Sequence, residues 1–326
     1  MPLVFGKDSG LLLEFESKYS GDIISDVYGD LREKFLSSRI DLDKILAKIF
    51  SKRGKGIRPV FMCLTSELVG GSWETVRNAS MIIEAIHLAS LLHDDVLDHA
   101  DLRRGDATIN ALYSDKVSIL FGDHIFVNAI MMTNELEHPG AVRVIHNAAK
   151  RMVEGEISDT LKDDVITEEA YIQIIGDKTA SLFAASGELG VILSGADGVE
   201  TEWARELGES LGTAFQIIDD TLDYDGNTDS MGKPKFLDVM SSNMTLPLIH
   251  SLGDMTAPEV KEFLAENKNS TEKISEFVIQ NGGIEYANKR ARDYSEKARG
   301  ILSRFDNKKS HRDFERFFEM LMKRHF

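Results

Sequence analysis

Apolar residues recur along this chain every three or four positions, while strict alternation of apolar and polar residues is scarce. The first pattern is typical of amphipathic α-helices and the second of half-buried strands, so an all-α fold is predicted. Turns such as Gly70-Gly71 and Gly282-Gly283 separate the helical stretches. No long flexible linker divides the chain, which favours a single large helical bundle spanning residues 1–326. Helices are predicted over residues 10–20, 21–37, 41–51, 57–69, 73–98, 107–113, 115–134, 140–162, 167–194, 198–223, 243–252, 257–268, 270–280, 283–303 and 309–323.

The helix predicted at residues 73–98 is apolar on nearly every face between Met81 and Leu92, which is typical of a buried helix. It nevertheless ends in the acidic sequence DDxxD, formed by Asp94, Asp95 and Asp98. The helix predicted at 198–223 ends in the same way, with Asp219, Asp220 and Asp223. Two buried helices are thus predicted to end in clustered carboxylates.

The first and fifth residues of a DDxxD set lie about 40° apart around a helix, and the second lies on an adjoining flank. Three carboxylates on one face repel each other, and burying them without a partner is costly. A single such set is usually a solvated acidic surface. The duplication and the buried helices favour an internal site instead. Oxygen ligands of this kind suit Mg²⁺, which also binds substrate phosphates.

Composition excludes several classes of protein. The chain has 326 residues, of which 42% are hydrophobic, and carries 38 basic and 54 acidic residues, a formal net charge of −16. Such an excess of acid argues against nucleic-acid binding. Cys63 is the only cysteine, so no intramolecular disulfide is predicted, and a buried, unreactive thiol is expected. No apolar stretch reaches the ~18 residues that span a bilayer, and no signal peptide is recognisable, so a cytoplasmic location is predicted.

Cationic residues flank the first acidic cluster. Lys55 and Arg58 lie among glycines before it, and Arg103 and Arg104 follow it. Arginine binds phosphate in a bidentate manner and lysine supplies a point charge. A basic pair in a loop is more often solvated, but its position beside a metal-binding cluster favours phosphate recognition.

At these residues the chain resembles the trans-prenyltransferases, the family of polyprenyl and geranylgeranyl diphosphate synthases. The resemblance covers roughly residues 50–250, and it is specific because many short motifs occur in the same order. These are Gly54-Lys55-Gly56-Ile57-Arg58-Pro59, His87, the first DDxxD set, Arg103-Arg104-Gly105, Gly122-Asp123, Lys178-Thr179-Ala180, Phe215-Gln216, the second DDxxD set, Gly232-Lys233-Pro234, Asp238 and Thr245-Leu246-Pro247.

The resemblance implies an isoprenoid synthase-like bundle with a central active-site cavity, and a homodimer. It implies head-to-tail condensation of isopentenyl diphosphate with an allylic diphosphate, dependent on about three Mg²⁺ per site, with Mn²⁺ as a substitute. A transient contact with a membrane for product release is also expected.

The resemblance also implies roles for individual residues. Isopentenyl diphosphate would be bound by Lys55, Arg58, His87 and Arg104, and the allylic diphosphate by Arg103, Lys178, Thr179, Gln216 and Lys233. The principal metal ligands would be Asp94, Asp98 and Asp219, with Asp95, Asp220 and Asp223 acting through water or orienting neighbours. The residues expected to carry catalysis are Asp94, Asp95, Asp98, Arg103, Lys178, Asp219, Asp220 and Lys233.

Two departures from the family pattern change these expectations. Ser242-Asn243 stands where the family usually has Gly-Lys, and Phe236 where a glycine is common. The first predicts weaker binding of the allylic diphosphate or compensation from elsewhere.

The small residues Ala89 and Ser90 stand where the family limits product length, so a product of twenty carbons or more is predicted, with about twenty-five to forty favoured.

Two alternative functions remain at this point. A class I terpene cyclase also ionises a diphosphate at an aspartate cluster, but usually lacks the second DDxxD set and the Lys55/Arg58 pair. A regulatory subunit of a hetero-oligomeric synthase would be expected to lose its metal ligands, whereas this chain retains both sets.

Overall fold

The computed structural model describes residues 19, 21–36, 39–103, 105–162, 165–196, 198–224, 244–267 and 270–322, except for the side chains of residues 271, 308 and 309. The described part is almost wholly helical, as predicted. Its main helices are α2 (Asp22–Phe35), α3 (Ile40–Ser51), α4 (Ile57–Leu68), α5 (Trp73–Leu97), α6 (Ile109–Leu112), α7 (Asp115–Met132), α8 (Pro139–Leu161), α9 (Glu168–Ile175), α10 (Ser181–Leu193), α11 (Val199–Leu222), α13 (Leu246–Leu252), α14 (Ala257–Asn267), α15 (Thr271–Gln280), α16 (Gly283–Leu302) and α17 (Lys308–Met322).

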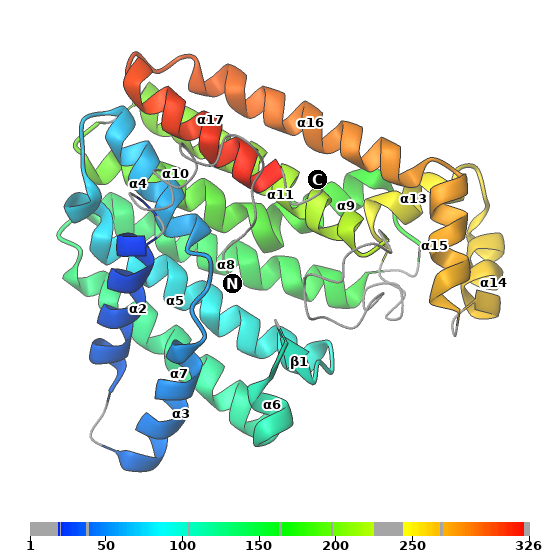
Figure 1. Cartoon of the computed structure of the whole chain (residues 1–326), viewed down its shortest axis with the longest axis horizontal. Coiled ribbons are helices and arrows are strands. Elements are labelled where there is room, and N and C mark those ends of the chain that lie inside the picture. Colours follow the sequence, from blue (N-terminus) through cyan, green and yellow to red (C-terminus); the bar gives the residue numbers. More distant parts are fainter. Residues whose placement is uncertain are drawn as a thin grey trace.

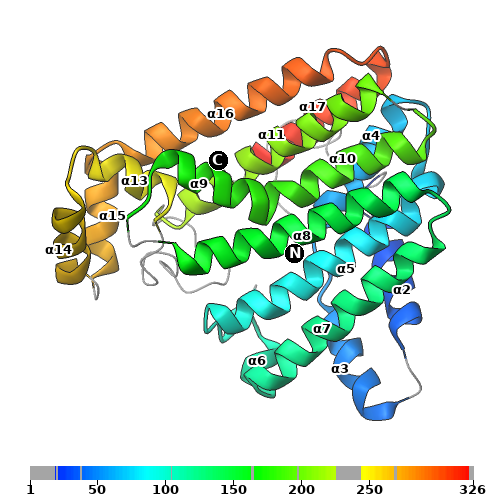
Figure 2. The ribbon, with the colours of Figure 1, turned by 180° about the vertical axis from the view of Figure 1, so that it is seen from behind.

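The long helices α5, α8 and α11 end on the same side of the bundle (Figures 1 and 2). Helix α11 packs against α10 and α16, and α5 packs against α4 and α7. The C-terminal helices α16 and α17 lie across the top of the bundle in Figure 1. Both DDxxD sets stand at the carboxyl-terminal ends of α5 and α11, so this arrangement brings them to one end of the molecule.

An aromatic part of the core lies between α4, α10 and α17. Phe61 of α4 stacks on Phe317 of α17 with ring centroids 5.9 Å apart, and packs edge to face on Phe314 at 6.1 Å. Phe183 of α10 lies 6.2 Å from the same ring. Residues 81–86 of α5 are all buried, which confirms that this helix is internal.

Helices α10 and α11 approach closely because α11 presents glycine at the contact. A Cβ on Gly208 would lie 2.3 Å from the carbonyl oxygen of Phe183, a distance that real side chains do not tolerate. This contact places the middle of α11 against the start of α10, which directly follows the predicted substrate-binding residues Lys178 and Thr179.

The structure departs from the predicted elements in two places. Residues 167–194 form α9, a π-helical turn η3 (Gly176–Ala180) and α10, instead of one regular helix. A short hairpin, β1 (Leu102–Arg103) and β2 (Asp106–Ala107), follows α5 and turns at Gly105, whose φ is +81°. Each feature involves only a few residues, which is too short a stretch to be recognised from hydrophobic periodicity.

Some predictions lie outside the described residues. These are the helix at 10–20, Arg104, Lys233, and the departures at Phe236 and Ser242-Asn243. No helix in the described ranges is both long and apolar enough to cross a membrane. The extent of the domain, residues 1–326, stays a prediction.

Candidate active site

Asp94 lies in the last turn of α5 and is half-buried. Burial, followed by repulsion from Glu156 and partly offset by Lys178, raises the pKa of Asp94 to about 7. Asp98, one turn further, caps the helix and is exposed. Asp94 and Asp98, which share a helical face, therefore lie at the end of α5. The positive charge near Asp94 does not fully offset its burial and the repulsion by Glu156.

The second aspartate of each set is turned into the protein. Asp95 is 4% exposed and accepts a hydrogen bond of 2.6 Å from Nε of Arg103. Asp220 is 7% exposed and accepts hydrogen bonds from Tyr171 Oη at 2.6 Å and Gln216 Nε2 at 2.7 Å. These two carboxylates are hydrogen-bonded to neighbouring side chains, and the orienting role expected for them stays a prediction.

The π-helical turn lies between the two aspartate clusters. Lys178 is close enough to Asp94 for their charges to interact. The next residue, Thr179, donates a hydrogen bond of 2.8 Å from Oγ1 to Gln216 Oε1, and Gln216 in turn donates to Asp220. Lys178 thus interacts electrostatically with the first cluster, while Thr179, the next residue, is linked by hydrogen bonds to the second.

A second cationic region consists of Arg58, in the first turn of α4, and Lys55, in the loop before it. Arg58 is 8% exposed, and its guanidinium lies 4.9 Å from the centre of the Phe183 ring. Burial, opposed by nearby Glu84 and Tyr28, lowers the pKa of Arg58 to about 10, so it is charged at neutral pH. Its Nε finds no hydrogen-bond acceptor among the described residues. A buried charged donor in this state is well suited to an anionic ligand.

The remaining predicted positions are distributed around these two regions. Lys55 is exposed in the loop before α4, and His87 is half-buried on α5. Asp219 and Asp223 are half-buried at the end of α11. Ala89 is fully buried on α5, whereas Ser90 is half-buried and bonds the His87 carbonyl oxygen at 2.8 Å.

The donor set at the end of α5 and α11 fits a hard divalent cation, because it consists of carboxylate oxygens and one of them is poorly compensated. Within the described ranges, no three carboxylate, imidazole or thiol side chains lie close enough to hold a metal ion by themselves. Ligands from water and from a bound phosphate would complete such a site, as is usual for Mg²⁺.

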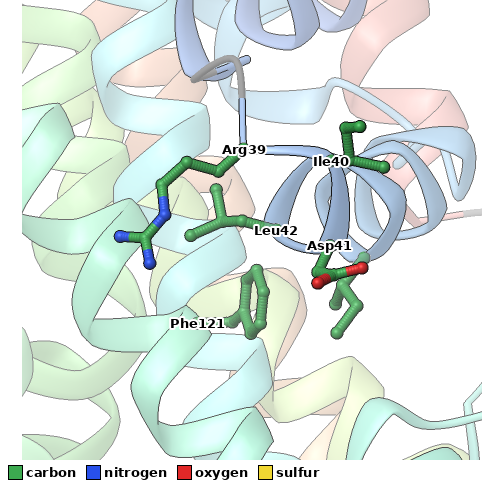
Figure 3. A pocket seen from close by; sticks show the side chains of 6 residues that line it. Arg39, Ile40, Asp41, Leu42 and Phe121 are labelled. Atoms are coloured by element: carbon green, nitrogen blue, oxygen red, sulfur yellow. The ribbon is translucent and has the colours of Figure 1, made fainter.

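A hollow of about 530 Å³ lies between the first turns of α3 and the side of α7 (Figure 3). Its walls include Leu42, Ile45 and Phe121, with Arg39 across its edge. None of the predicted site residues lines it, so it is separate from the candidate active site.

A family profile described as polyprenyl synthetase matches residues 40–280. The chain belongs to the polyprenyl synthetase family. Octaprenyl diphosphate synthase of Escherichia coli K12 is 36% identical over 262 residues, covering 78% of this chain and 81% of that protein. Nonaprenyl diphosphate synthase of Mycobacterium tuberculosis is 38% identical over 211 residues, covering 64% of this chain and 62% of that protein.

Solved structures agree with this assignment. The polyprenyl synthase of Caulobacter crescentus CB15, complexed with calcium and isoprenyl diphosphate, superposes over the full length of both chains with a TM-score of 0.87 and 26% identity. A decaprenyl diphosphate synthase of Rhodobacter capsulatus gives 0.87 with 26% identity, over 96% of this chain and 99% of its own.

As a polyprenyl synthetase, the chain is a prenyltransferase, and its family is generally metal-dependent. It condenses isopentenyl diphosphate with an allylic diphosphate to a linear all-trans prenyl diphosphate of twenty carbons or more, with release of pyrophosphate. The predicted fold class and reaction are confirmed.

Sequence reasoning missed two carboxylates of the candidate site, Glu156 and Asp159 on α8. Both pair with Lys178, at 2.8 and 3.0 Å from its Nζ. Together with Glu154 they resemble a solvated acidic face of α8. Their i, i+3 spacing beside Gly155 is the one local signal that could have pointed to them.

Proposed function

We propose that the ends of α5, α8 and α11, with the π-helical turn, form the site where the allylic diphosphate is bound and ionised. The observation that supports this most strongly is the π-helical turn, whose Lys178 interacts electrostatically with Asp94 and whose Thr179 is linked through Gln216 to Asp220. The turn brings a cation and a hydroxyl group close to the two acidic clusters, and a metal-bound diphosphate needs such groups around it.

Each group has a distinct part in this mechanism. Asp94, Asp98 and Asp219 would hold about three Mg²⁺, with Asp223 completing the second cluster; these ions, when bound, supply positive charge that favours departure of pyrophosphate. Lys178 and Arg103 add charge to the same leaving group, and Asp95 holds Arg103 in place. The buried wall of α5 excludes water that would quench the allylic cation.

The second substrate is proposed to bind at Arg58 and Lys55. The Nε of Arg58 is buried and has no acceptor in the described part of the chain, so a diphosphate oxygen would satisfy it. The double bond of isopentenyl diphosphate then attacks the cation, and the departing pyrophosphate takes up the proton that is released. No side chain is needed as nucleophile or base.

The decisive test is an elongation assay on the purified chain alone, with labelled isopentenyl diphosphate and a geranyl, farnesyl or geranylgeranyl diphosphate primer. We expect elongation with Mg²⁺, similar or lower activity with Mn²⁺, and none with EDTA. Failure of the folded, metal-supplied chain to elongate any primer would favour the regulatory-subunit alternative. Hydrocarbon from an allylic diphosphate alone would favour a cyclase.

The metal requirement should depend on pH. The pKa of Asp94 is raised to about 7, chiefly by burial, and a carboxyl group must lose its proton to bind a cation. Protons therefore compete with Mg²⁺ below this pH. We expect the Mg²⁺ concentration that gives half-maximal activity to rise as the pH falls through about 7, and to level off above it. A requirement that does not change with pH would contradict this assignment of Asp94.

For the product we propose an octaprenyl chain of forty carbons, the upper end of the range predicted from Ala89 and Ser90. The relative in Escherichia coli bears the name octaprenyl diphosphate synthase, and that in Mycobacterium tuberculosis nonaprenyl. Resolving the products of the elongation assay by length tests this directly.

We also propose a homodimer that forms through α7 and α8. Leu120, Val127 and Met131 are exposed and lie on one side of α7, because they are seven and four residues apart. On α8, Val153, Ile157 and Leu161 are exposed at intervals of four. Both helices lie on the face toward the viewer in Figure 2. Exposed apolar stripes of this kind are typical of subunit interfaces.

Substitution of Val127 and Met131 by glutamate should weaken this dimer at least tenfold. The change removes apolar contact and places charge in the interface, an effect of at least ~1.4 kcal/mol. Sedimentation velocity over a range of protein concentrations measures it. Ile279→Glu, at an exposed position on α15, is the matched control and should leave the assembly unchanged. A variant that sediments like the unmodified chain would contradict the proposed interface.

Three further points stay predictions. These are that residues 1–326 act as one domain, that the protein is cytoplasmic, and that it contacts a membrane transiently to release product. Cell fractionation tests the second of these, and vesicle flotation in the presence of product tests the third.

A further inference from the structure

Helix α8 touches the backbone of the π-helical turn at Gly155. A Cβ at this position would lie 2.6 Å from the backbone N of Lys178 and 2.9 Å from the carbonyl carbon of Asp177, so only glycine permits the contact. The two backbones therefore meet at the residue whose side chain is proposed to bind the allylic diphosphate.

One turn before Gly155, α8 holds the π-helical turn through an ion pair. Arg151 Nε donates to Asp177 Oδ1 at 2.8 Å, and its NH2 group reaches Glu209 of α11 at 3.0 Å. A π-helical turn carries one more residue than an α-helical turn, so its side-chain directions depend on neighbouring elements. The pair with Arg151 fixes the turn relative to both α8 and α11.

On the other side of Gly155, α8 holds the side chain of Lys178. The ammonium nitrogen lies 2.8 Å from Glu156 Oε2 and 3.0 Å from Asp159 Oδ2. Burial alone would lower the pKa of Lys178, but the charges of Asp159 and Glu156 outweigh it and raise that pKa. The side chain is thus held as a cation within electrostatic reach of Asp94.

An ammonium group has three N–H donors, and the two carboxylates engage two of them. One donor remains for a phosphate oxygen. A lysine side chain has many rotamers, and fixing it after substrate arrives would cost about 1.5–2 kcal/mol of conformational free energy. Carboxylates that hold it beforehand reduce this cost, although they are themselves too negative to contact the diphosphate.

We propose that Glu156 and Asp159 are positioning residues, which hold the Lys178 ammonium in the orientation that receives the allylic diphosphate. This inference rests on the proposed role of Lys178. In this proposal, Glu156 and Asp159 of α8 affect substrate binding only by holding Lys178.

A double-mutant cycle tests the proposal, using the full-length chain and geranylgeranyl diphosphate as the variable substrate. Glu156→Gln should raise the KM for the allylic diphosphate about tenfold and leave the KM for isopentenyl diphosphate unchanged. In a Lys178→Ala background the same change should alter the KM by less than about twofold. Glu156→Asp, which keeps the charge, should restore part of the loss.

The control is Glu154→Gln, on the same helix. This carboxylate is exposed and pairs only with Lys150 among the described residues, so neither KM should change. Circular dichroism confirms that each variant folds. If Glu156→Gln does not fold, Asp159→Asn and Glu156→Asp replace it in the cycle. If none of the three variants folds, the proposal is overturned and the two carboxylates have a structural role.

Two kinetic outcomes are informative in different ways. An equal effect of Glu156→Gln with and without Lys178 would overturn the proposal, because Glu156 would then act on substrate or metal directly. If Lys178→Ala itself left the KM for the allylic diphosphate unchanged, the proposed role of Lys178 would fail, and the positioning role with it. The single Lys178 variant separates the two cases.

Discussion

Replacement of Asp94 by asparagine is expected to lower kcat by about 10³-fold or more. A metal ion contributes several kcal/mol to stabilising a departing anion, and ~4 kcal/mol corresponds to this factor. Asparagine keeps the size and an oxygen of the side chain but lacks the charge that binds a divalent cation. Asp219→Asn should have an effect of the same order, because its carboxylate heads the second cluster. Steady-state kinetics at saturating Mg²⁺ measure both.

Stability separates this loss from unfolding. The raised pKa of Asp94, about 7, shows that the folded protein disfavours its ionised form in the absence of metal. Because the folded pKa lies above the usual value, ionisation at higher pH costs stability, and asparagine avoids that cost. The Asp94→Asn variant should therefore unfold at the same or a higher temperature without Mg²⁺.

Asp254→Asn is the matched control, since Asp254 is an exposed aspartate in the turn after α13. It should retain full activity. A fall of less than tenfold for Asp94→Asn at saturating Mg²⁺ would contradict the role of Asp94 as a principal ligand.

Ala89→Tyr should shorten the product to about fifteen to twenty carbons. Ser90 lies one helical turn, about 6 Å, before Asp94 on the same side of α5, and Ala89 lies beside it. We expect a prenyl chain that grows inward from the diphosphate site to pass these positions, so that a ring at either one would stop it. Ser90→Phe, at a half-buried position, should shorten the product in the same way. Chromatography of the dephosphorylated products measures the length.

The control is Ala89→Ser, which keeps the side chain small and should leave the product unchanged. Ala89 is 0% exposed, so a tyrosine that found no tunnel beside it would overpack the core and destabilise the protein by about 1–3 kcal/mol. A folded, active Ala89→Tyr enzyme with an unchanged range of products would show that the chain does not pass α5 at this point.

Most helices were predictable because their periodicity is a local property. Phe314, Phe317, Phe318 and Leu321 of α17 recur every three or four residues and are all buried. The aspartate clusters were visible for a related reason. Carboxylates at the end of an apolar helix contradict the local pattern, and such conflicts mark functional sites.

The sequence could not reveal the π-helical turn or the partners of Lys178. A π-helical turn differs from an α-helical one by a single residue in the backbone, and here it contacts Gly155 and Arg151 of another helix, which no local pattern reveals. The different surroundings of the aspartates within each DDxxD set could likewise be predicted only in part. Helical geometry separates Asp220 from Asp219, but the hydrogen bonds from Tyr171 and Gln216 to the buried Asp220 carboxylate depend on tertiary packing.

The helices, the two acidic clusters and the cations beside them could therefore be predicted from the chain, because each depends on residues that are close in sequence. Which of these charged side chains form pairs depends on the tertiary structure. Glu156 and Asp159 reach Lys178, and Arg103 reaches Asp95, through packing of α8 and of the β1–β2 hairpin. Such pairings depend on the distance between side chains in space, and hydrophobic periodicity carries no information about that distance.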